Sequence, residues 1–214
     1  DKDRINIEET KTNKLCDSII TNSHLSYILF QKIYPSYLDK LKPFVDTTFC
    51  VRRLNQKVFT KEYDIILICS NFKRESKNQL FLLNVLNNKC FDKYKKIMIG
   101  EESEIFKHIK NSLCLPLQLH NKCIEYMSKS KILLHTAVCE SNSNTMREAY
   151  YHKCLPLITK NVGYFELYPE YLICDNFTKD EWINKLNNVL ENYEEIKDIK
   201  INYNKSLDIN KLFY

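Results

Sequence analysis

Two glutamates, Glu140 and Glu148, lie in the segment KILLHTAVCESNSNTMREAYYHKCLPLIT, residues 131–159, with seven residues between them. Its apolar and polar pattern predicts a strand, a loop, a helix and a second strand. The candidate N-cap residues of that helix are Asn142, Ser143 and Asn144. A helix beginning near Asn144 would direct its positive end at a phosphate, and Glu148 could accept hydrogen bonds from ribose hydroxyls. The alternative is structural, with Glu148 favoured by the helix dipole and Glu140 a solvated loop carboxylate, and the segment alone does not decide between them.

A second candidate site follows the predicted strand 64–70, where a loop carries Lys73, Arg74 and Lys77. Arginine and lysine at the end of a strand, beside a helix N-terminus, can hold a diphosphate, arginine through two hydrogen bonds and lysine as a point charge. The alternative is a solvated basic loop on a lysine-rich protein.

Glycine is scarce, with two residues in 214 against about fifteen at the usual 7%. Gly100 and Gly163 are too far apart for the clustered glycines of dinucleotide-binding or phosphate-binding loops. Ordinary Rossmann dehydrogenases, Walker-type NTPases and kinases are therefore excluded. Both glycines follow or end predicted strands.

Short apolar segments alternate with amphipathic ones along the chain, which is the pattern of a doubly wound parallel sheet in an α/β, Rossmann-like fold. The predicted strands are 18–22, 47–51, 64–70, 95–100, 112–117, 131–136, 154–159 and 171–175. The predicted helices are 24–33, 76–90, 101–110, 120–129, 144–153, 163–168 and 178–193. Ligands of such sheets bind beyond the carboxyl ends of the strands, where the loops with Lys77 and Glu140 would lie.

The composition is that of a globular protein with 44% hydrophobic residues and a net charge of +5 spread along the chain, so we expect no nucleic-acid partner. Nine cysteines, an odd number without a C-x-x-C motif, favour reduced core residues and a cytoplasmic location over disulfides or zinc. We expect no transmembrane segment and no secretory signal. Because residue 1 is Asp, we expect the chain to be part of a longer protein.

The order of these segments resembles the donor-binding domain of the retaining glycosyltransferases of family 4, which have the two-domain GT-B architecture. The resemblance rests on the basic loop, KIMIGEES, the two glutamates and CLPLITKNVGYFE, and covers residues 60–193. The segment KLCDSIITNSHLSYILFQKIYP resembles the last strand and helix of the family's acceptor-binding domain. The resemblance implies that the chain has three parts: a remnant of the acceptor-binding domain with a linker at 1–46, the donor-binding domain at 47–193 and a helical tail at 194–214.

The resemblance implies transfer of a hexose from a nucleoside diphosphate sugar to a hydroxyl of a glycan, lipid or protein, with retention and with no metal or other cofactor. Glu140 matches the glutamate near the donor sugar, Glu148 the ribose ligand and Lys77 a diphosphate ligand. The remaining matches are Ser143, Asn144 and Thr145 to backbone that receives sugar and phosphate oxygens, Gln118, Leu119 and His120 to the nucleobase contact, and Gly163 and Gly100 to loop glycines beside the ligand.

The chain departs from the family pattern in its basic loop, where Asn71 and Phe72 replace a Gly-Arg pair, and Arg74 is the candidate replacement for that arginine. Ser143 also replaces a glycine. We interpret His135 as a packed or capped histidine, not a catalytic one, and Trp182 as a core residue. Two other functions stay open: a binding module that kept the fold but lost the chemistry, and a nucleotide-sugar epimerase or hydrolase of the same architecture.

Overall fold

The computed structural model describes residues 19–20, 24–42, 59–140 and 143–201. The chain divides into two units, one from Asp1–Thr48 with Asn202–Tyr214 and the other from Phe49–Ile201. The predicted strand at 47–51 and the last residues of the predicted tail lie outside the described residues.

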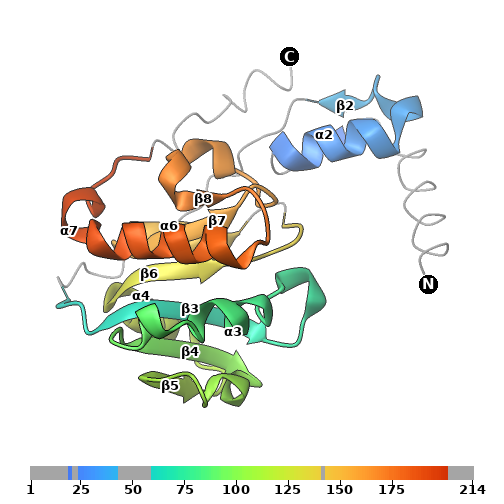
Figure 1. The fold of residues 1–214 in the computed structure, drawn as a ribbon. Helices are drawn as coiled ribbons and strands as arrows, with labels where there is room; N and C mark the ends of the chain where they lie inside the picture. Colours follow the sequence, from blue (N-terminus) through green and yellow to red (C-terminus); the bar gives the residue numbers. More distant parts are fainter. Residues whose placement is uncertain (1–18, 21–23, 43–58, 141–142, 202–214) are drawn as a thin grey trace. The chain divides into compact units, whose positions relative to one another are not determined.

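The second unit contains a six-stranded sheet in which every neighbouring pair of strands is parallel (Figure 1). Its strands are β3 (Tyr63–Asn71), β4 (Lys96–Glu101), β5 (Ser112–Leu115), β6 (Ser130–His135), β7 (Leu155–Thr159) and β8 (Ile173–Cys174). They lie in the order β5-β4-β3-β6-β7-β8. The chain therefore runs outward from β3 in one direction and then, after β6, in the other, which confirms the predicted doubly wound α/β fold.

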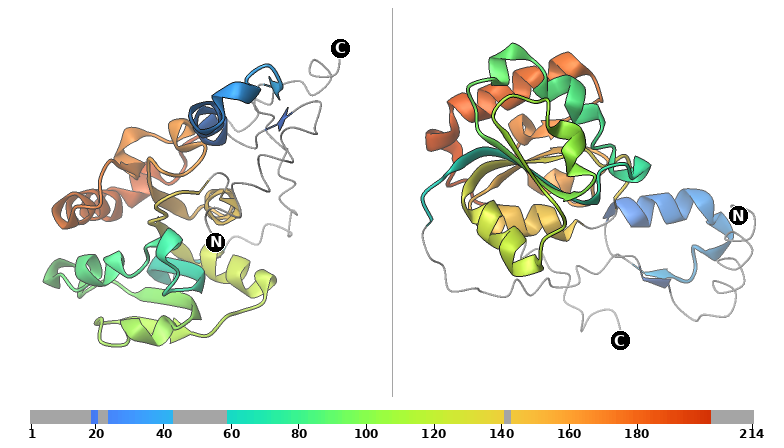
Figure 2. Two further views of the ribbon diagram at one scale, coloured as in Figure 1. Left: turned by 90° about the vertical axis from the view of Figure 1, so that its right-hand side faces the viewer. Right: turned by 90° about the horizontal axis from the view of Figure 1, so that it is seen from below.

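Helices cover both faces of the sheet (Figure 2). They are α3 (Phe81–Leu86), α4 (His120–Ser128), α5 (Asn144–Tyr151), α6 (Lys179–Glu191) and α7 (Tyr193–Ile196). α3 packs against α6 on one face and α4 packs against α5 on the other. Because both faces are covered, strand residues of either orientation are buried, as Ile65, Ile66 and Leu67 are in β3. Trp182 of α6 is fully buried, as predicted.

The predicted helix at 76–90 is shorter than expected. α3 spans Phe81–Leu86 and is flanked by the 3-10 turns η2 (Glu75–Lys77) and η3 (Lys89–Phe91). Asn78 has a φ of 48°, a left-handed conformation that ends the first turn and that asparagine tolerates. The side chain of Asn88 accepts a hydrogen bond from the Cys90 N–H and starts the second turn. The predicted helices at 101–110 and 163–168 are likewise 3-10 turns, η4 (Ser103–Phe106) and η5 (Phe165–Leu167).

Gly100 lies in the sheet and not in a loop after a strand, where the sequence placed it, and its expected closeness to a ligand stays a prediction. It lies within β4 with a φ of +150°, and a Cβ atom there would lie 1.8 Å from the Cys69 carbonyl oxygen of the neighbouring strand. Only glycine allows the two strands to approach so closely.

The first unit holds β1 (Ile19–Ile20), α2 (His24–Ile33), the 3-10 turn η1 (Pro35–Tyr37) and β2 (Leu41–Lys42). β1 and β2 pair in parallel, Ile19 with Leu41 and Ile20 with Lys42. The predicted helix at 24–33 is confirmed, and β1 lies within the predicted strand 18–22. β2 was not predicted, because its residues fall in the part expected to be a linker. A two-residue strand is too short to show an apolar period.

Candidate functional site

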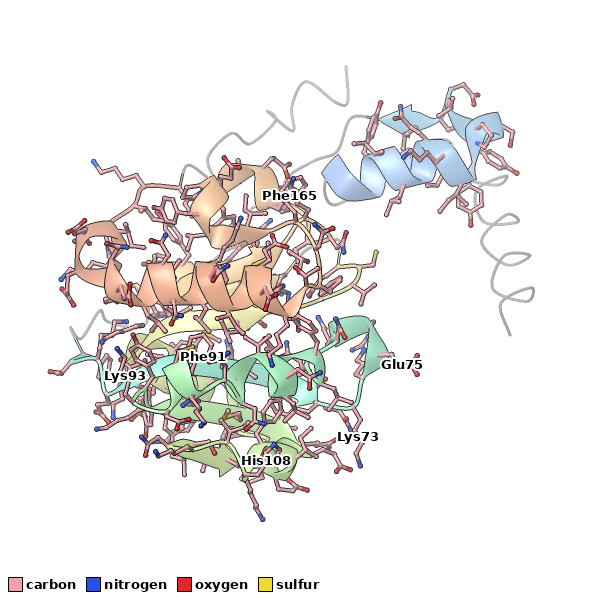
Figure 3. All side chains as sticks on the ribbon, viewed as in Figure 1. Lys73, Glu75, Phe91, Lys93, His108 and Phe165 are labelled. Carbon is pink, nitrogen blue, oxygen red and sulfur yellow. The ribbon has the colours of Figure 1, made fainter. Side chains whose placement is uncertain are left out.

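The loops that follow β3 and β6 are bonded to each other at the carboxyl end of the sheet. The Thr136 hydroxyl donates to the carbonyl oxygens of Lys77 and Asn78, at 3.0 and 3.1 Å. The Val138 N–H donates to the Ser76 carbonyl at 3.0 Å. Figure 3 shows Glu75 of this loop at one end of the sheet, with Lys93, which precedes β4, at the other. The two segments that the sequence singled out therefore meet.

The loop after β7 holds the same cluster from the other side. The Glu140 N–H donates to the Asn161 carbonyl at 3.0 Å, and the Gly163 N–H donates to the Glu140 carbonyl at 2.7 Å. The Thr159 hydroxyl donates to the Ala137 carbonyl at 2.9 Å. Gly163 is thus next to Glu140, and its N–H helps to hold the backbone of that residue in place.

The Glu140 carboxylate is bound at both oxygens. Lys77 Nζ lies 2.7 Å from Oε1, and His135 Nε2 lies 2.6 Å from Oε2. The Glu140 side chain is only 18% exposed. Burial raises the pKa of this carboxyl, but the bonds and charges of His135 and Lys77 outweigh burial and lower the pKa to about 2. Glu140 is therefore an anion at neutral pH, suited to accepting hydrogen bonds and not to donating a proton.

Ser143 is the N-cap of α5, one of the three candidates that the sequence offered. Its hydroxyl oxygen accepts a hydrogen bond from the Met146 N–H at 3.4 Å, and the residue is 1% exposed. Its φ of −90° is ordinary for any residue, so the position does not require glycine. The next two residues, Asn144 and Thr145, belong to the first turn, where backbone N–H groups have no acceptor within a helix.

Glu148, one turn into α5, has a weaker partner than Glu140. His120 Nε2 lies 3.1 Å from its carboxylate, and this histidine is 67% exposed. Burial raises the pKa of Glu148, and the nearby His120 opposes that shift. Leu119, expected at the nucleobase contact, is the exposed residue that precedes α4. The backbone carbonyl of Gln118 accepts a hydrogen bond from the thiol of Cys123.

Two expected residues of the basic loop are engaged elsewhere. The Arg74 Nε donates to the Ser76 hydroxyl at 3.1 Å, and the side chain is exposed. The Asn71 amide donates to Glu101 at 3.2 Å, and its oxygen accepts from the Lys73 N–H at 2.8 Å. No bond in the described residues joins either side chain to Glu140.

Phe72, which the resemblance aligned with an arginine, is fully buried and packs against Phe106 with 5.2 Å between ring centroids. The β3–β4 register shifts between Ile68 and Asn71, so alternation along the strand did not predict which way residue 72 would face. Residue 72 is therefore part of the core.

Sequence reasoning missed the part of His135 in the site. It is buried, as expected for a packed histidine, but it also contacts Glu140. The sequence feature that could have indicated this contact is the position of His135 near the end of a predicted strand, five residues before Glu140.

Within the described parts of the chain, no helix is long and apolar enough to cross a membrane. Nor do those parts contain a group of three or more His, Cys, Asp or Glu side chains that could hold a metal ion. The seven cysteines in these parts are free thiols. Cys69, Cys154 and Cys174 are buried, as expected for core residues, whereas Cys139 is exposed.

No family model matches the sequence, and no curated protein matches it either. Solved structures do share its fold. Anabaena HepE in complex with UDP and glucose superimposes with a TM-score of 0.72 at 15% identity, over 92% of this chain and 60% of that one. WaaG, a glycosyltransferase involved in lipopolysaccharide biosynthesis, superimposes with a TM-score of 0.61 at 15% identity, over 85% of this chain and 58% of that one.

The catalytic domain of the Helicobacter pylori cholesterol-α-glucosyltransferase gives a TM-score of 0.54 at 17% identity, over 63% of this chain and 90% of that domain. The chain thus spans about three fifths of the HepE and WaaG structures that it matches. At these identities the likeness shows the fold: an α/β, Rossmann-like sheet of the kind found in these glycosyltransferases.

Proposed function

We propose that this chain is the donor-binding part of a retaining glycosyltransferase, which moves a hexose from a nucleoside diphosphate sugar to an acceptor hydroxyl. The observation that carries the proposal is the contact between Lys77 and Glu140, three residues before the N-cap of α5, at the carboxyl end of the sheet. A cation, an anion and a helix N-terminus are the groups that a sugar diphosphate needs.

In this proposal the departing diphosphate is stabilised by Lys77, by the first-turn N–H groups of Asn144 and Thr145, and by Arg74 from the same loop. These groups supply the positive charge, so the mechanism does not depend on a metal. Glu148 accepts hydrogen bonds from the ribose, and the backbone near Leu119 meets the nucleobase. Glu140, held as an anion, orients a hydroxyl of the donor sugar.

The acceptor would bind to a second domain. The parallel β1 and β2 joined by α2 form a β-α-β unit, which supports the interpretation of residues 1–46 as the end of that domain. The acceptor, whether glycan, lipid or protein, would be selected there. The free thiols of the described cysteines support a reducing compartment, and the proposal places the protein in the cytoplasm.

Calorimetry with UDP, GDP and ADP tests the proposal. We expect weak binding of at least one of them, because this chain supplies one wall of the site, and no sugar transfer by the chain alone. The absence of heat with all three at millimolar concentration would contradict the donor site. Turnover by the isolated chain would contradict the division between donor and acceptor parts. Binding without transfer by a longer protein that includes the acceptor domain would favour the binding-module alternative.

A further inference from the structure

We infer that His135 is a positioning residue for Glu140: it holds one carboxylate oxygen in place when Lys77 turns from the other oxygen to the donor diphosphate. The inference rests on the proposed function. It assigns to a buried histidine a task that neither the motif nor the fold assigns.

The two partners of Glu140 differ in how freely they can move. His135 is the last residue of β6, its backbone pairs with Ile158 of β7, and its side chain is only 4% exposed. Lys77 lies at the end of the η2 turn, and its side chain is 23% exposed on a long, flexible stem. A ligand that enters the site can therefore draw Lys77 toward itself, whereas His135 must stay.

A diphosphate would compete with Glu140 for Lys77 because both are anions and the ammonium group is a compact point charge. Glu140 would then lie beside the negative diphosphate with less of its own charge balanced. The 2.6 Å contact from His135 Nε2 to Oε2 remains, and so do the backbone bonds of Glu140 to Asn161 and Gly163. The carboxylate thus keeps the orientation that the donor sugar meets.

This role predicts an effect that depends on the sugar and passes through Glu140. In His135→Phe the ring remains but the polar nitrogen is lost, whereas His135→Gln can place an amide nitrogen near the same point. Calorimetry with UDP and with UDP-glucose is carried out on the wild type, both variants, Glu140→Gln and the double variant His135→Phe/Glu140→Gln. Thermal melting of each variant verifies that it is folded.

We expect His135→Phe to weaken UDP-glucose binding at least fivefold while UDP binding changes less than twofold. His135→Gln should restore most of the loss. In the Glu140→Gln background the histidine substitution should have no further effect, since the two residues act as one unit. Equal losses for UDP and UDP-glucose, or an undiminished loss in that background, would overturn the inference and leave His135 a packing residue.

The failure of the proposed function has a different signature. If the folded wild type binds neither UDP nor UDP-glucose, nor the GDP and ADP counterparts, the proposed function and the role of His135 in it are both overturned. If the wild type binds but the variants show additive effects, the donor site stands and only the positioning role is wrong.

Discussion

The surroundings of Glu140 and of Glu148 differ although both glutamates lie at the carboxyl end of one sheet. Around Glu140 the protein supplies a partner for each oxygen, and the pKa falls to about 2. Around Glu148 the contact is with an exposed histidine, and burial raises the pKa. The first carboxylate is already balanced by the protein, whereas the second gains from a neutral hydrogen-bond donor such as a ribose hydroxyl.

The difference shows that motif residues of one type can have opposite effects on the fold. Ionised Glu140 stabilises the folded state through its two partners. Ionised Glu148 costs stability because burial disfavours its charge.

The largest effect should follow Lys77→Met, which removes the cation shared by Glu140 and the ligand. We expect UDP binding to weaken by about 10- to 100-fold, since a hydrogen bond to a charged group contributes about 1.5–3 kcal/mol. Calorimetry measures it. Lys73→Met is the matched control, because Lys73 is on the same loop but is 58% exposed and pairs with Glu102. An equal loss of UDP affinity in both variants would show that the basic charge of the loop binds UDP without a specific role for Lys77.

Glu140→Gln should lower the free energy of unfolding by about 3 kcal/mol at pH 7, because the pKa falls from 4.5 to about 2 and each pKa unit corresponds to about 1.4 kcal/mol. The folded-state pKa lies below the ordinary value of 4.5, so the stabilisation is complete above pH 4.5 and is lost as the pH falls toward 2. Urea unfolding of wild type and variant across this range measures the difference.

Glu125→Gln is the control for that experiment. Glu125 pairs with the exposed Lys122 of α4 and with Lys129, the residue after α4, and its side chain is 32% exposed against 18% for Glu140. Ion pairs that solvent reaches contribute little, so we expect a smaller effect here. A Glu140→Gln difference that does not change between pH 7 and pH 3 would show that charge is not its source.

Glu148→Ala should weaken UDP binding by about fivefold, the loss of about 1 kcal/mol of hydrogen bonding. The melting temperature should not fall appreciably. His120→Ala is the paired control: it removes the partner of Glu148. Because the proposed nucleobase contact near Leu119 is made by backbone, this variant should leave UDP binding nearly unchanged. A large drop in melting temperature with unchanged binding would instead assign Glu148 to the start of α5.

The smallest effect concerns the stability of Glu148→Gln, which should rise slightly at pH 7. Because burial raises the folded-state pKa above 4.5, the folded protein binds more protons than the unfolded chain between these two values, and stability falls as the pH rises through them. The variant should lack this slope in urea unfolding just above pH 4.5. A loss of stability at pH 7 would contradict the contrast with Glu140.

The sequence was sufficient to predict the parallel sheet and the edge of the sheet at which the loops of Lys77 and Glu140 meet. Long apolar runs such as those of β3 and β6 are typical of buried parallel strands, and parallel strands bring their carboxyl ends to one edge. The contact of Lys77 with Glu140 follows from that placement. The roles of these residues toward a ligand remain predictions.

Other features depend on tertiary geometry that a single sequence does not display. A histidine at the end of an apolar strand is expected to pack, and only the fold of the 136–140 loop brings Glu140 back onto His135. The burial of Phe72 depends on the irregular register between β3 and β4 near Asn71. The need for glycine at position 100 comes from the Cys69 carbonyl of another strand.

The most direct test of the donor site is a titration of the ¹⁵N-labelled chain with UDP, followed by backbone amide NMR signals. We expect the shifts to concentrate in Lys77, Leu119, Glu148 and residues 143–145, all at the carboxyl end of the sheet. Shifts confined to the opposite end, where Lys61, His152 and Tyr193 line a cavity of about 380 Å³, would contradict it.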